Sequence, residues 1–229
     1  MEKKYLILGL IVLGVAAALM FGSPKTLKSY DDVVDISTLI NEGDSVNYSE
    51  NATIIKTSAS YHPAVNDLNK LTRMSQIILT GTVREIKDSK KVQVKVVEDS
   101  SDTMDYIYTD IVIDVDSYIK KQKSAESKTI TIRNDGGCVQ NLCYEVEDAP
   151  SFKVGEKVFL LLISRDVYTK DIGDKHYRVL GGMFGKFSVS DSYGIREKLP
   201  KGQRVYKLDD LSKLAKENKD ILDNPELVT

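Results

Sequence analysis

The 229-residue chain has no tryptophan, two cysteines and two histidines, and these shortages exclude several kinds of site. A zinc site normally needs four ligands, and besides the cysteines only His62 and His176 are available, neither at ligand spacing. Neither sign of charge predominates: the chain has 32 basic and 34 acidic side chains, and no like-charged block reaches five residues. Without a basic stripe to neutralise phosphates, we expect no nucleic-acid partner.

Signatures of catalysis are absent as well. The chain contains no G-x-S-x-G elbow and no H-E-x-x-H helix, and neither histidine stands in a diagnostic setting beside an acid or a nucleophile. The segment GGMFGKF is not a phosphate loop, because only three residues separate Gly181 from Gly185 and Phe187 follows Lys186. It predicts a tight hairpin or bulge. The sequence thus gives no positive sign of an enzyme and indicates no cofactor.

Calcium is the one metal that the acidic residues suggest. Asp110, Asp114 and Asp116 lie on one face of a predicted strand and would bind calcium together with the loop at 99–105. No D-x-[DN]-x-[DN]-G loop is present, however, and a solvated strand face explains the three carboxylates more simply. We therefore predict no metal site.

What the chain does have is an uncharged apolar run at residues 5–21, YLILGLIVLGVAAALMF. As a helix it would span roughly 26 Å, close to the hydrocarbon thickness of a bilayer. Its one good small-x-small triplet, at 16–18, lies inside the run, where a signal peptidase would leave an apolar stub. We therefore interpret residues 1–23 as a signal anchor, a single transmembrane helix, with a cleaved signal and a secreted protein as the alternative.

The flanking charges barely decide the orientation of this anchor. Lys3 and Lys4 precede the run and Lys25 and Lys28 follow it, which is close to a tie. The short N-terminal tail and the two cysteines favour a C-terminal region outside the cytoplasm. Because no cysteine lies in or just after the run, a lipid-modified cysteine anchor is excluded.

The two cysteines, Cys138 and Cys143, stand in GGCVQNLC. In an oxidising compartment a disulfide across this short loop would contribute on the order of 2 kcal/mol of stability. A buried pair of free thiols is the second interpretation, and a metal site or a nucleophilic cysteine is the weakest. We predict the disulfide.

Two triplets fit the acceptor pattern for N-glycosylation, at Asn47 and Asn51. About one such triplet is expected by chance in a chain of this composition, so the pair is consistent with export without proving it.

Behind the anchor we expect a juxtamembrane linker at 24–60 and one domain at 61–229. Helical spacing of apolar residues predicts a helix from Pro63 to Met74, and a second amphipathic helix begins with Asp209 as its N-cap. Between them, alternating or continuous apolar runs predict seven or eight short strands, of which the following are the clearest: 76–86, 91–97, 106–115, 129–133, 158–163, 177–180 and 183–189. Many short strands with helices only at the edges indicate a mainly β barrel or sandwich.

The order of these pieces resembles a widespread family of uncharacterised exported proteins of bacteria and archaea. The resemblance covers about residues 64 to 190 and rests on SQIILTGTVREI, TDIVIDVDSYIK, ITIRNDGG, APSFKVGEKVFLLL and YRVLGGMFGKFSV. It implies a small β-barrel of oligonucleotide/oligosaccharide-binding (OB) topology, and no activity. The chain departs from the family at Ile119-Lys120-Lys121, where a glycine is expected, and the cysteine pair is not part of the pattern.

Function is constrained only coarsely by these features. We expect a membrane-anchored extracytoplasmic binding module for a cell-surface protein or glycan, with Tyr106, Tyr108 and Tyr144 as a candidate ligand face, because tyrosines can stack on sugars or peptides. The alternatives are a cell-envelope hydrolase with an unrecognised site and a structural spacer. Tyrosine is equally a common strand residue, so packing within the sheet is the alternative interpretation of these three side chains.

Overall fold

The computed structural model describes residues 27–32, 51–57, 66–95, 101–121, 127–164, 169, 172–196 and 198–218. The predicted membrane anchor, Asn47 and His62 lie outside these residues. Within the described part of the chain, neither helix is long and apolar enough to span a bilayer.

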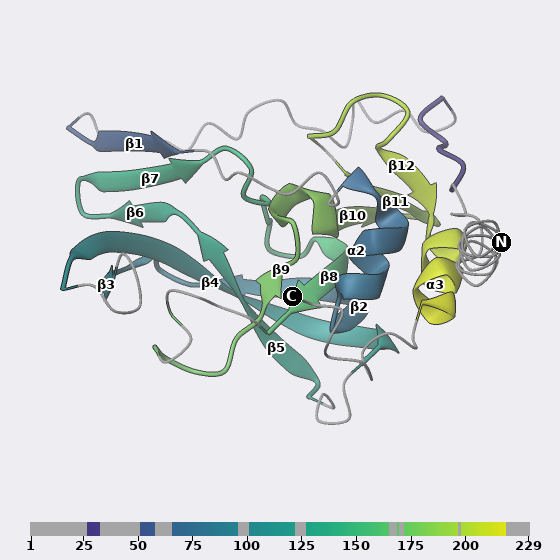
Figure 1. The fold of residues 1–229 in the computed structure, drawn as a ribbon, viewed down its shortest axis with the longest axis horizontal. Helices are drawn as coiled ribbons and strands as arrows, with labels where there is room; N and C mark the ends of the chain where they lie inside the picture. Colours follow the sequence, from purple (N-terminus) through teal and green to yellow (C-terminus); the bar gives the residue numbers. More distant parts are fainter. Residues whose placement is uncertain are drawn as a thin grey trace, which may run out of the picture.

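The mainly β architecture predicted from the sequence is confirmed (Figure 1). The elements in chain order are β1 (Thr53–Thr57), α2 (Leu68–Met74), β2 (Ile77–Ile86), β3 (Lys90–Lys95), β4 (Thr103–Lys120), β5 (Thr129–Asp135), β6 (Gly137–Val139), β7 (Leu142–Val146), β8 (Lys157–Ile163), β9 (Arg178–Val179), the 3-10 helix η3 (Gly182–Gly185), β10 (Lys186–Ser190), β11 (Tyr193–Ile195), β12 (Val205–Lys207) and α3 (Leu208–Glu217). The strand expected from residue 183 therefore begins with η3 and becomes extended only at Lys186.

The nine-stranded sheet is buried on both faces at its centre, where β2 and β8 pair antiparallel. Because successive side chains point to opposite faces, Ile77 and Leu79 enter one core while Ile78 enters the other. The run from Val158 to Leu162 is buried throughout, which confirms the central strand that its continuous apolar sequence predicts. One core lies among β2, β4, β5 and β8, and the second is covered by α2 and α3.

Gly81 lies at an irregularity in the pairing of β2 with β4. The register of β2 against β4 shifts between Thr80 and Gly81. A Cβ at Gly81 would lie 2.5 Å from the carbonyl oxygen of Asp114. The two backbones therefore approach too closely here for any side chain.

The predicted closed barrel is not formed. The sheet runs in the order β12-β11-β10-β8-β2-β4-β3, with β5 added to β4 and β9 to β8. β5 and the segment just before β9 meet at an isolated parallel bridge between Ile132 and Tyr177. Because β9 is two residues long and β10 to β12 continue the sheet beyond β8, this bridge does not extend into a ladder that closes a barrel.

Three strands form a separate small sheet in the order β1-β7-β6. β6 and β7 are a hairpin whose turn contains Gln140 at a φ of 54°. Gly136 and Gly137 stand where β5 leads into this hairpin, and both have positive φ values, which glycine adopts readily. In Figure 1 the small sheet lies at the same end of the molecule as the hairpin of β3 and β4, opposite α3 and β12.

The two helices begin differently from what the sequence predicts. Asp67 is the N-cap of α2, where its carboxylate accepts hydrogen bonds from the main-chain amides of Asn69 and Lys70. The N-cap of α3 is Lys207 rather than Asp209, which instead lies in the first turn. The helix begins earlier than predicted because β12 leads directly into α3. Asp209 still has a favourable place near the positive end of the helix dipole.

Candidate functional site

Two of the three candidate tyrosines share one face of β4 but are not open to solvent. Tyr106 and Tyr108 lie two residues apart, with their ring centroids 6.3 Å from each other, and pack with Val92 and Val94 of β3. Tyr108 is only 1% exposed, so its ring cannot stack on a ligand in this conformation. The pair is a packed cluster rather than the open face that we expected.

Arg133 occupies the space over Tyr108. Its guanidinium carbon is 3.9 Å from the ring centroid, and its Nε and Nη2 atoms donate to the two carboxylate oxygens of Asp110 at 2.8 and 2.9 Å. Nη1 also donates to the carbonyls of Thr169 and Ile172, at 3.3 and 2.8 Å. Together with the bidentate ion pair, these two bonds hold Thr169 and Ile172 against β4 and β5. Asp110 is therefore engaged by Arg133, while Asp114 pairs with Arg84 at 3.2 Å.

Tyr106 belongs to a second polar cluster, which does reach the surface. Its hydroxyl donates to Asp135, and Arg178 donates both to Asp135 and, at 3.0 Å, to the Tyr106 hydroxyl. Burial raises the pKa of Tyr106 far above its ordinary value, so the phenol is neutral. Burial alone would lower the pKa of Arg178, but Asp135 and Tyr106 hold it above its ordinary value. The Asp135 and Arg178 side chains are 27% and 21% exposed, so this fixed ion pair offers hydrogen-bonding groups to solvent.

Tyr144, the third candidate, lies on β7 in the small sheet, opposite Gly137 and Ile55. The structure therefore divides the three tyrosines between two sheets. Beside Tyr144, the predicted disulfide between Cys138 and Cys143 is confirmed. The two cysteines are direct cross-strand partners, so the bond closes the β6–β7 hairpin.

Strand β1 is the most exposed element of the small sheet. All five of its residues are exposed, including Ile54 at 39% and Ile55 at 38%, whose side chains project from opposite faces. It pairs with β7 in parallel, and it is the edge of the three-stranded sheet. Exposed apolar residues on the edge strand of a sheet are typical of a surface that pairs with another chain.

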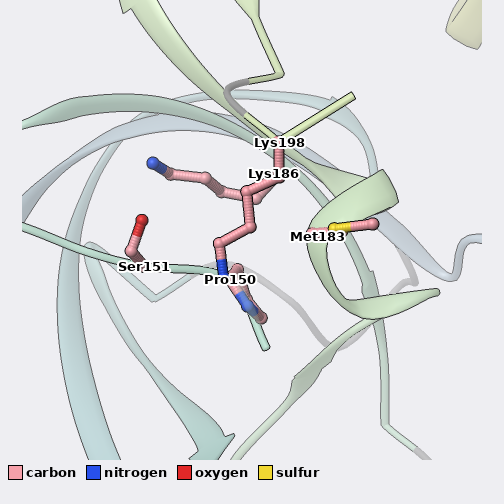
Figure 2. Close-up of a pocket in the computed structure, with 5 residues that line it drawn as sticks. All are labelled: Pro150, Ser151, Met183, Lys186 and Lys198. Carbon is pink, nitrogen blue, oxygen red and sulfur yellow. The ribbon is translucent and has the colours of Figure 1, made fainter. Parts of the chain in front are cut away.

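A small pocket lies between the 150–156 loop and β10 (Figure 2). It is lined by Pro150, Ser151, Met183, Lys186 and Lys198, and the space within it admits about a single water molecule. Lys186 is buried beside Ser188, with Nζ 2.7 Å from the serine Oγ, which resembles a nucleophile and its base. Glu156, however, forms an ion pair with the same ammonium group and accepts a hydrogen bond from the Ser188 hydroxyl at 2.6 Å. These contacts tie the 150–156 loop to β10.

Lys120 has a structural role that we did not predict from the sequence. It ends β4, is 3% exposed, and donates from Nζ to the carbonyls of Thr72 at 2.9 Å, Arg73 at 3.0 Å and Asn218 at 3.4 Å. These carbonyls belong to the C-terminal ends of α2 and α3, so one ammonium group caps both helices. Burial lowers the pKa of Lys120 to about 8.

The remaining predicted residues are placed separately. His176 is buried and its Nδ1 lies 3.0 Å from the carbonyl of Asp174. Asn51 lies exposed in a turn just before β1, where a glycan would be accessible. Among the described residues no group of three or more His, Cys, Asp or Glu side chains is arranged to hold a metal ion.

Compared with known proteins, the chain matches no family model, and no curated protein is significantly similar to it.

Proposed function

We propose that this protein is a membrane-anchored extracytoplasmic module that binds another protein of the cell surface through β1. The observation that carries the proposal is the exposure of all five β1 residues at the edge of a disulfide-closed sheet. The apolar run at 5–21 supports the anchor, and the disulfide supports an oxidising compartment.

The mode of binding follows from the hydrogen bonds of β1. The amide of Thr53 donates to the Asn141 carbonyl at 2.7 Å, and the Thr57 carbonyl accepts from Glu147 at 2.9 Å. Because main-chain groups alternate in direction along a strand, those of Ile54 point away from β7. An extended segment of the partner would pair with these groups, while pockets on the partner would take up Ile54 and Ile55.

The pairing order supports an OB-like origin for the larger sheet. Strands β2, β4, β5, β9 and β8 follow one another in a circuit whose last contact is the parallel bridge between Ile132 and Tyr177. Such a five-stranded, partly open arrangement is typical of OB-folds, which bind ligands on their surface strands and loops. The topology is consistent with a binding role and specifies no ligand.

The test is site-specific photocrosslinking in intact cells. A photoreactive residue in place of Ile54 or Ile55 should give a discrete adduct of higher mass, and the same residue in place of Val154, a more exposed apolar residue on another surface, should not. The adduct should disappear when the remaining isoleucine is changed to aspartate, because charge on the edge prevents strand pairing. Equal adducts at all three positions, or none at 54 and 55, would contradict binding through β1.

The anchor and its orientation are tested by fractionation of tagged cells and protease shaving. The C-terminal domain should be in the membrane fraction and should be digested in intact cells. Protection of that domain until the cells are broken would contradict the extracytoplasmic location.

A glycan is the second candidate ligand, favoured by the cluster of Tyr106, Asp135 and Arg178. The carboxylate and guanidinium are held in place and partly exposed, and such groups can hydrogen-bond sugar hydroxyls. Binding to a glycan array that is lost in Arg178→Met, with the urea midpoint followed as a control for folding, would favour this candidate over a protein partner.

A further inference from the structure

The first described segment, residues 27–32, is fixed along β12 and is called the clip. The main-chain amide of Tyr30 donates to the Val205 carbonyl at 2.8 Å, and the Val205 amide donates back to the Asp31 carboxylate at 2.7 Å. The Asp31 carboxylate also accepts from the Gly202 amide. Leu27 packs against the core beneath α2 and α3. The clip is therefore attached to the domain through both main-chain and side-chain contacts.

The clip and the neighbouring strands β11 and β12 together carry a group of side chains suited to a phosphate-rich surface. The ammonium groups of Lys28 and Lys207 lie 5.2 and 4.9 Å from the centroid of the Tyr30 ring, and both lysines are exposed. The Tyr193 ring packs against Tyr30, with centroids 5.9 Å apart. Lysine and tyrosine together are typical of the membrane interface, where the ring meets the apolar boundary and the ammonium groups meet phosphates.

The length of chain before the clip limits where this surface can be. Five residues, 22–26, separate the apolar run from Leu27. Six residue steps span at most roughly 20 Å, even when fully extended. The headgroup layer takes up about 5–8 Å of that distance. The clip must therefore stay close to any bilayer that holds residues 5–21.

We infer that Lys28, Tyr30 and Lys207 form a membrane-contact surface that binds phospholipid phosphates, so that the domain stands with β12 toward the bilayer and the β1 sheet away from it. Figure 1 supports this geometry, because β12 and α3 lie at the opposite end of the long axis from β1, β3, β6 and β7. The inference rests on the proposed function, since it requires the anchor. It adds an orientation that leaves the edge of β1 free for a partner.

The test is energy transfer from a labelled domain to labelled headgroups in liposomes that contain the full chain. The donor is attached to a single new cysteine, either Gln203→Cys beside the clip or Gln93→Cys on β3, while the native cysteines remain in their disulfide. Both glutamines are exposed, so neither substitution removes core packing. Transfer should be severalfold more efficient from position 203 than from position 93. Equal transfer, or the reverse order, would overturn the orientation.

A charge variant tests the headgroup contact itself. Lys28→Gln combined with Lys207→Gln should bring the transfer from position 203 closer to that from position 93, because the short linker alone does not fix the tilt. The matched control, Lys91→Gln with Lys95→Gln on β3, should leave both values unchanged. An unchanged ratio in the Lys28 and Lys207 variant would overturn phosphate binding at this surface.

Flotation of the liposomes separates failure of the anchor from failure of the inference. Protein that floats but shows no difference between positions 203 and 93 overturns the orientation and leaves the anchor standing. Protein that does not float overturns both.

Discussion

The buried lysine that caps both helices makes a quantitative prediction about pH. The pKa of Lys120 is about 8 in the folded protein and 10.5 for an ordinary lysine. Between these values the unfolded chain binds a proton that the folded protein has released, so the free energy of unfolding rises with pH. Between pH 7 and pH 9.5 the expected gain from this one group is about 2 kcal/mol.

Tyr106 sets the upper limit of the pH range over which the effect of Lys120 can be measured. Because burial raises its pKa, the unfolded chain loses this proton first, and stability falls as the pH rises past about 10. Measurements that stop at pH 9.5 therefore separate the effect of Lys120 on stability from that of Tyr106. Below about pH 8 both states hold the proton, and the curve for Lys120 should be flat.

The assay is urea unfolding of the full chain in detergent, followed by far-ultraviolet circular dichroism at several pH values. Lys120→Met should lose the rise between pH 8 and pH 9.5, whatever its stability at neutral pH. Lys121→Met, which changes the exposed neighbour, should keep it. If the Lys120→Met and wild-type curves run parallel over this range, the buried ammonium does not have the lowered pKa on which the reasoning depends.

Substitutions at three sites test the fold. Cys138→Ser with Cys143→Ser should lower stability by about 2 kcal/mol, measured as the difference in urea unfolding from the oxidised protein; no difference would mean that the hairpin is ordered without the bond. Arg133→Met should cost about 3–5 kcal/mol because it leaves Asp110 buried without its partner, whereas Arg133→Met with Asp110→Leu should recover part of that loss. Gly81→Ala should cost at least about 1–3 kcal/mol, because the new Cβ would overlap the backbone of β4; a stability equal to wild type would show that the two strands separate easily.

The parts of the fold that sequence predicts well are those set by local periodicity. The continuous apolar run of β8 gives a strand buried on both faces. The alternation of apolar and polar residues in β3 and β5 gives strands with one face more exposed to solvent than the other. The cysteine spacing gives the disulfide, because the two residues are near neighbours in the chain.

What sequence could not predict depends on pairing between distant elements. The acceptors of Lys120 lie 48, 47 and 98 residues away, so no local pattern could identify its role as a cap. Tyr106 and Tyr108 lie on a common face as expected, but their burial depends on β3 and Arg133. The prediction of a closed barrel was wrong for a similar reason, since the length of β9 and the addition of β10 to β12 are properties of the whole sheet.

The disulfide connects the location of the protein to its proposed binding surface. β1 is paired with β7, and β7 is half of the hairpin that the disulfide closes, so the order of the edge strand depends on that hairpin. In a reducing compartment the hairpin would lose the cross-link, and β1 would lose the support of an ordered neighbour. Reduction should therefore abolish the photoadduct at position 54 without detaching the protein from the membrane. An adduct that persists after Cys138 and Cys143 are reduced would show that the surface at β1 forms independently of the oxidising compartment.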